Sequence, residues 1–169
     1  MKQLFFILAF MTFVIYGQAQ DERFDHPVIQ WDGTEASFSE IASNGKNKVV
    51  LFWASYCGAC KYELKALEET VGDWEEKYGA ELVMVSVDRP NVRKDAAMLV
   101  KDKGWDSYTN VFDKTNLLFS GFKAYGLPLT LTVDGNGEVT GYWKGYLPNL
   151  MQQIDMKLKK MDKKKRKNS

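Results

Sequence analysis

The sequence predicts an α/β fold, a mixed sheet with helices on both faces, from three observations. Two buried-strand patterns, at residues 49–54 and 81–88, are each followed by a stretch with helical periodicity. A hairpin pattern at residues 129–145 comes after them. A last helical stretch at 147–161 completes the domain.

The first strand pattern, VVLFWA at residues 49–54, is a continuous apolar run that suits a strand buried on both faces. The stretch from Lys61 to Gly79 has apolar residues spaced by three and four positions: Leu64, Leu67, Val71 and Trp74. This periodicity predicts an amphipathic helix that ends near Gly79.

The second strand pattern, at residues 81–88, precedes a helix that we expect to be capped at Asn91 and closed by Gly104. A short strand at 109–113 and a third helix at 114–126 follow. The polar stretch that precedes the first strand predicts an irregular lead-in with one short strand and one short helix.

The hairpin at residues 129–145 turns through a Gly-Asn-Gly sequence, which supplies the positive φ values that a tight turn needs. The final helix follows it, with Pro148 expected near its first turn.

Residues 1–19 have the pattern of a cleaved secretory signal peptide: Lys2, an apolar run that ends at Tyr16, and small residues before a cleavage site after Ala19. The alternative is a membrane anchor, but a spanning helix needs roughly 20 apolar residues. The signal peptide predicts a periplasmic or otherwise extracytoplasmic protein.

One domain is expected over residues 20–156, followed by a basic tail at 157–169 whose one acidic residue is Asp162. Such a charge run is typical of a solvated chain end. Contact with an anionic membrane surface or an acidic partner is the alternative. Acidic residues outnumber basic ones within the domain, and no nucleic-acid partner is expected.

The protein has two cysteines, Cys57 and Cys60, placed between the first strand and its helix. Unpaired N–H groups and the helix dipole favour negative charge there, and such sites lower a thiol pKa from about 8.5 to between roughly 3.5 and 7.5. We therefore assign Cys57 as the attacking nucleophile and Cys60, one turn into the helix, as the resolving thiol. A purely structural role is disfavoured because the pair closes a very short loop.

The segment FWASYCGAC at residues 52–60 resembles the FWAxWCxxC signature of thioredoxin-like proteins, and the CKYEL that follows resembles the exported branch related to TlpA and ResA. Residues 125–145 are similar to the family segment that holds a cis-proline and a hairpin. The resemblance implies a thioredoxin-like fold and an exported thiol:disulfide oxidoreductase that acts as a reductant and needs no cofactor beyond its dithiol. Its partners would be exported protein thiols or disulfides and a membrane electron donor.

The same resemblance implies that Cys57 and Cys60 form the redox-active disulfide. It also implies the residues that would face the substrate or support that surface: Trp53, Tyr56, Leu127 and Pro128. Trp53 would be a packing wall beneath the pair. The Leu127–Pro128 bond is predicted to be cis, and its loop would offer backbone groups to an extended substrate.

Glu63 matches an acid that exported family members keep near the dithiol, where it would assist proton transfer at Cys60. Leu51 occupies the position of thioredoxin's buried Asp, which leaves Glu63 as the nearest candidate acid. The alternative is a surface Glu that complements the helix dipole.

Three other functions are alternatives for a protein with this cysteine pair. A metal-binding protein would need further ligands, and His26 is the remaining soft candidate in the predicted mature chain. A thiol peroxidase would place its Cys in a Pro-Thr-rich loop, which does not surround Cys57. A redox-inactive binding module would have no use for two cysteines in this spacing.

Overall fold

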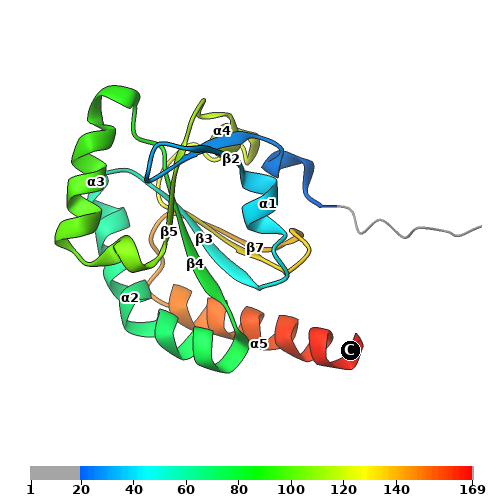
Figure 1. Cartoon of the computed structure of the whole chain (residues 1–169). Coiled ribbons are helices and arrows are strands. Elements are labelled where there is room, and N and C mark those ends of the chain that lie inside the picture. The colour runs from blue at the N-terminus through cyan, green and yellow to red at the C-terminus, as the bar shows by residue number, and fades with distance from the viewer. Residues whose placement is uncertain (1–19, 169) are drawn as a thin grey trace, which may run out of the picture.

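A seven-stranded mixed sheet runs through the protein, with helices on both of its faces (Figure 1). The computed structural model describes residues 20–168, so the predicted signal peptide at 1–19 lies outside the described residues. The strand order is β2-β1-β5-β4-β3-β6-β7. Within it β3, β4 and β5 are parallel, whereas β6 is antiparallel to β3 and β7 is antiparallel to β6.

The strands are β1 (Pro27–Gln30), β2 (Glu35–Ser37), β3 (Lys48–Trp53), β4 (Glu81–Ser86), β5 (Thr109–Asp113), β6 (Leu129–Val133) and β7 (Val139–Lys144). The α-helices are α1 (Phe38–Ala42), α2 (Gly58–Tyr78), α3 (Arg93–Asp102), α4 (Leu117–Gly121) and α5 (Leu150–Asn168). The 3-10 turns are η1 (Glu22–Phe24), η2 (Pro90–Val92) and η3 (Trp105–Ser107).

The centre of the sheet confirms the two predicted βα units and the hairpin. Every residue of β3 is buried, because the strand lies between β4 and β6 and is covered on both faces. Leu51 pairs with Met84 of β4 on one side and with Thr130 of β6 on the other. The β6–β7 turn uses Gly137, whose φ is +86°.

Helix α2 ends as the sequence predicts, at Gly79 in the left-handed region with φ +58°. Its apolar stripe packs with residues of α3 and α5 on one face of the sheet. The other face is covered by η1, α1 and α4, through an aromatic group of Phe24, Phe38, Phe52, Phe119 and Phe122. Each face of the sheet therefore has its own core.

Two predictions about helices differ from the structure. Asn91 lies in η2 and is not the cap of α3, which begins at Arg93, whereas Gly104 ends that segment as predicted with φ +71°. The predicted helix over 114–126 shortens to α4, because the backbone turns through positive φ values at Asn116 and Lys123 on either side of it.

The lead-in forms two strands where one was predicted. β1 and β2 pair as an antiparallel hairpin, and β1 adds to the sheet along β5. The short predicted helix is α1.

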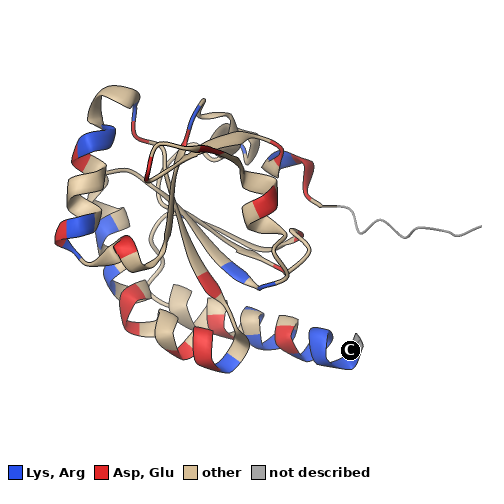
Figure 2. Ribbon diagram, in the orientation of Figure 1, with Lys and Arg blue, Asp and Glu red and all other residues tan. Residues whose placement is uncertain are grey.

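Helix α5 continues to Asn168, through the residues predicted as a solvated basic tail. Leu158 and Met161 extend the apolar stripe of the helix and are buried. Exposed basic residues gather beyond Asp162, at the C-terminal end of α5 (Figure 2). Pro148 lies two residues before the helix. Within residues 20–168, no helix combines the length and the apolar character needed to cross a membrane.

Candidate active site

The two cysteines lie where β3 ends and α2 begins. The chain leaves the sheet at Trp53 and turns, and the Cys57 N–H donates to the Ala54 carbonyl at 3.0 Å. Cys57 is the N-cap of α2 and Cys60 lies in its first turn. A disulfide bond joins the two residues, whose Cα atoms are 5.3 Å apart.

The two sulfur atoms differ in environment. Cys57 is half-buried, whereas Cys60 is fully buried in the core between the sheet and α2. The Cys57 sulfur accepts a hydrogen bond from the Cys60 N–H at 3.1 Å. In the reduced protein that N–H and the helix dipole would stabilise a thiolate at Cys57.

The turn before Cys57 is held by Asp88, which the sequence analysis missed. Asp88 is 2% exposed and follows β4. Its carboxylate accepts from the Ser55 N–H at 2.9 Å, the Ser55 hydroxyl at 2.8 Å and the Ser86 hydroxyl at 2.8 Å. The sequence does carry a signal for Asp88, since it is a lone acid at the carboxyl end of a buried strand.

Glu63 is fully buried one helical turn after Cys60, so the surface alternative for this residue is wrong. Its Oε1 accepts a hydrogen bond from the Thr130 hydroxyl, while its Oε2 has no partner among the described residues. Burial raises the pKa of Glu63 to about 7, and the Thr130 bond opposes that rise. Residues three apart on a helix share one face, which places this acid on the side of Cys60.

Trp53 is fully buried and cannot contact a substrate. The prediction that it binds substrate is therefore wrong, and its role is packing. Its ring meets that of Trp105 edge-on, with centroids 6.4 Å apart. Trp53 and Cys60 belong to the same buried cluster.

The loop before β6 faces Cys57 across a groove. The Leu127–Pro128 bond is cis, as predicted. Pro128 is buried and Leu127 is half-buried. The groove is lined by Tyr56, Cys57, Val87, Arg89, Asn116, Phe119, Ala124, Tyr125, Gly126 and Leu127.

Two tyrosines on the groove are open to solvent. Tyr56 is 73% exposed and Tyr125 is 97% exposed. The Lys144 ammonium lies 5.9 Å from the centroid of the Tyr125 ring, and it donates to the Lys123 carbonyl at 3.3 Å. These contacts link β7 to the loop that carries Tyr125, Gly126 and Leu127.

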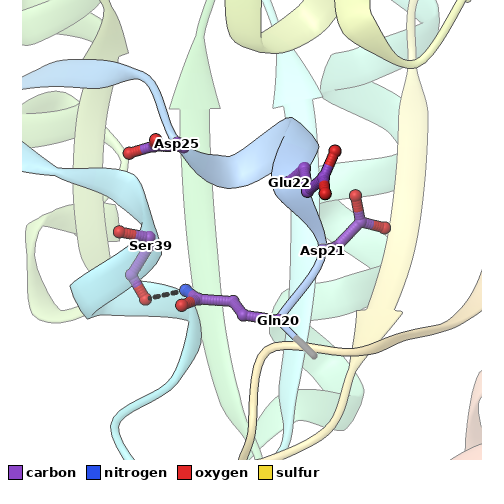
Figure 3. Close-up of a pocket in the computed structure, with 5 residues that line it drawn as sticks. All are labelled: Gln20, Asp21, Glu22, Asp25 and Ser39. Atoms are coloured by element: carbon purple, nitrogen blue, oxygen red, sulfur yellow. Dashed lines mark hydrogen bonds between the residues drawn. The ribbon is translucent and has the colours of Figure 1, made fainter. Parts of the chain in front are cut away.

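A second hollow lies around Gln20, Asp21, Glu22, Asp25 and Ser39 (Figure 3). The Asp21 N–H donates to the Gly137 carbonyl in the β6–β7 turn, at the end of the sheet away from Cys57. Asp21 and Glu22 lie on one side of the hollow and Asp25 on the other (Figure 3). Among the described residues, no three His, Cys, Asp or Glu side chains come together as a metal site.

The sheet order, the cis-proline loop and the cysteine pair at the start of α2 define a protein of thioredoxin-like fold. The chain belongs to the AhpC/TSA family, whose sequence pattern matches residues 18–142.

Two curated relatives are thiol-disulfide oxidoreductases ResA. The protein from Oceanobacillus iheyensis is 31% identical over 107 residues, which are 61% of this chain and 52% of the relative. The protein from Halalkalibacterium halodurans is 26% identical over 114 residues, which are 68% of this chain and 62% of the relative. The matches therefore span between about half and three fifths of these relatives.

Solved structures support the fold. An uncharacterized thioredoxin-like protein from Porphyromonas gingivalis superimposes with a TM-score of 0.74 at 24% identity, over 82% of this chain and 90% of that one. StoA from Bacillus subtilis superimposes with a TM-score of 0.60 at 20% identity, over 78% of this chain and 93% of that one.

Proposed function

We propose that the protein is an extracytoplasmic thiol:disulfide oxidoreductase that reduces disulfides in exported proteins through Cys57 and Cys60. The observation that carries the proposal is the pair at the start of α2, with a half-buried sulfur beside a groove and a fully buried one behind it. The names of the ResA relatives support the reaction class. The dithiol supplies both electrons, so the reaction needs no other cofactor.

The reaction begins with the reduced protein. The Cys57 thiolate attacks a substrate disulfide, forms a mixed disulfide and releases one substrate sulfur as a thiolate. The Cys60 thiolate then attacks the Cys57 sulfur, which closes the disulfide of the protein and releases the second substrate sulfur. The dithiol loses two electrons and the substrate disulfide gains them.

Glu63 would accept the proton of the Cys60 thiol before the second step. Cys60 is fully buried, so its thiol has little access to water as a base. A carboxyl with a pKa of about 7 is half ionised near neutral pH, which suits a general base. A membrane electron donor would then reduce the disulfide again.

The test separates the two cysteines. Cys60→Ser should accumulate mixed disulfides with exported proteins, because the attacking thiol remains and the resolving thiol is gone. Cys57→Ser should trap little, because Cys60 is buried. Both variants would be expressed with the signal segment intact and compared on non-reducing gels.

Equal trapping by both variants would refute these roles. Absence of trapping by either would favour the metal-binding or binding-module alternatives. Equilibration of the wild-type pair with glutathione would measure the potential, and a value more oxidising than the glutathione pool would contradict the reductant role.

A further inference from the structure

Arg89 brings a positive charge to the groove beside Cys57. It follows Asp88 at the end of β4, is exposed, and lines the groove together with Tyr56, Cys57 and Leu127. All the other residues described as lining this groove are uncharged. Arg89 is therefore the one charged residue among those described as lining this groove.

The charge of Arg89 is not neutralised within the part of the chain described, since Arg89 forms no ion pair there. The adjacent carboxylate of Asp88 is buried and accepts from Ser55 and Ser86. Arg89 therefore remains available to a bound molecule.

The hollow on the other side of Tyr56 has a different charge. It is lined by Ser55, Tyr56, Lys61, Val92, Asp95 and Leu99, so it carries one cation and one anion. The groove that Leu127 lines therefore carries an excess of positive charge, and the hollow that Lys61 lines does not.

We infer that Arg89 is a specificity-determining residue, which selects extended substrate segments that carry an Asp or Glu side chain close to the reacting cysteine. The inference rests on the proposed function and names its substrate class. A guanidinium recognises a carboxylate with two parallel hydrogen bonds, which a Lys cannot reproduce. The exposed tyrosines at the groove offer apolar contact to the same segment.

Arg89 could also stabilise the Cys57 thiolate through space. That effect would change the reaction with every substrate by the same factor. The effect on the thiolate therefore cancels in the ratio of rates for two substrates that differ in one carboxylate. This ratio therefore isolates recognition from thiol activation.

The experiment compares two peptide disulfides of equal length, with Glu or Gln two residues from the reacting cysteine. The measured quantity is kcat/KM for reduction by the dithiol protein. For the wild type we expect the Glu peptide to be favoured about fivefold at low salt, falling towards equality at high ionic strength. Arg89→Gln should abolish the preference, and Arg89→Lys should keep part of it.

Lys61→Gln is the matched control, because it removes a cation from the hollow between Tyr56 and Asp95 and should leave the ratio unchanged. An equal ratio in the wild type and Arg89→Gln, with both peptides reduced, would overturn the inference and leave the proposed function standing. No reduction of either peptide would overturn both. If Arg89→Gln slowed the reduction of glutathione disulfide and left the peptide ratio unchanged, the carboxylate that Arg89 binds would belong to glutathione. That result would contradict the inferred peptide substrate.

Discussion

The Thr130 hydroxyl donates a hydrogen bond to the Glu63 carboxylate in the buried layer between β6 and α2. Thr130 lies two residues after the cis-proline, and Glu63 lies one turn after Cys60. The bond therefore joins the strand that follows the cis-proline to the helix that carries the disulfide. Leu51, the cross-strand neighbour of Thr130, supplies no second polar group there.

The buried carboxyl of Glu63 should make stability fall as pH rises. Its pKa is 4.5 in the unfolded chain and about 7 in the folded protein, so between these values the folded state binds more protons. The free energy of unfolding should lose about 3 kcal/mol across this window and level off above pH 7. Glu63→Gln should remove that loss. Urea unfolding of the oxidised protein at several pH values would measure it.

Glu69→Gln is the control for this prediction, because Glu69 lies on the same helix and is exposed. Its pH profile should match that of the wild type. A profile of Glu63→Gln that keeps the wild-type slope would show that Glu63 ionises normally in the folded protein.

Thr130→Val should destabilise the protein at neutral pH by about 1–3 kcal/mol, because it leaves the Glu63 carboxyl without its donor. It should also raise the pKa of Glu63 further, since the Thr130 bond favours the ionised form. Thr130→Ser keeps the hydroxyl and should retain the wild-type pH dependence. Titration of Glu63 by NMR in the three proteins would test this, and an unchanged midpoint in Thr130→Val would disprove the coupling.

Asp88→Ala should loosen the turn that presents Cys57. Three donors, from Ser55 and Ser86, lose their acceptor, at a cost of about 2–3 kcal/mol in the free energy of unfolding. The reduced variant should also show a higher pH midpoint for alkylation of Cys57, since the cap geometry that stabilises its thiolate is relaxed. Asp102→Ala, at an exposed position of α3, should change neither quantity. An unchanged alkylation profile would limit Asp88 to a structural role.

Truncation should separate the packed and the solvated parts of α5. A chain that ends at Met156 loses the buried side chains of Leu158 and Met161, and should be destabilised by about 3–5 kcal/mol. A chain that ends at Asp162 keeps both and should change by less than about 1 kcal/mol, because it loses mainly exposed cations. Thermal or urea unfolding would measure both. If the two truncated proteins were equally stable, the packed domain would end at Met156, as the sequence predicts.

Local patterns along the chain determined the central architecture. The apolar runs of β3 and β4, the stripe of α2 and the Gly that ends it are each written in a short stretch of sequence, because strand burial and helix amphipathicity depend on residue spacing. The placement of Cys57 and Cys60 at a helix start follows from the same local order. The resemblance to a known family added Glu63 and the cis bond at Pro128.

Tertiary structure alone decided which distant residues complete the site. Thr130 is 67 positions from Glu63, and Asp88 is 33 positions from Ser55, so no local spacing could pair them. The burial of Trp53 and the packing of Leu158 depend on side chains contributed by other elements. Arg89 lines the groove beside Cys57 because β3 and β4 are parallel neighbours whose carboxyl ends meet at one edge of the sheet. Such contacts arise from strand order and layer packing, which become visible only when the chain is folded.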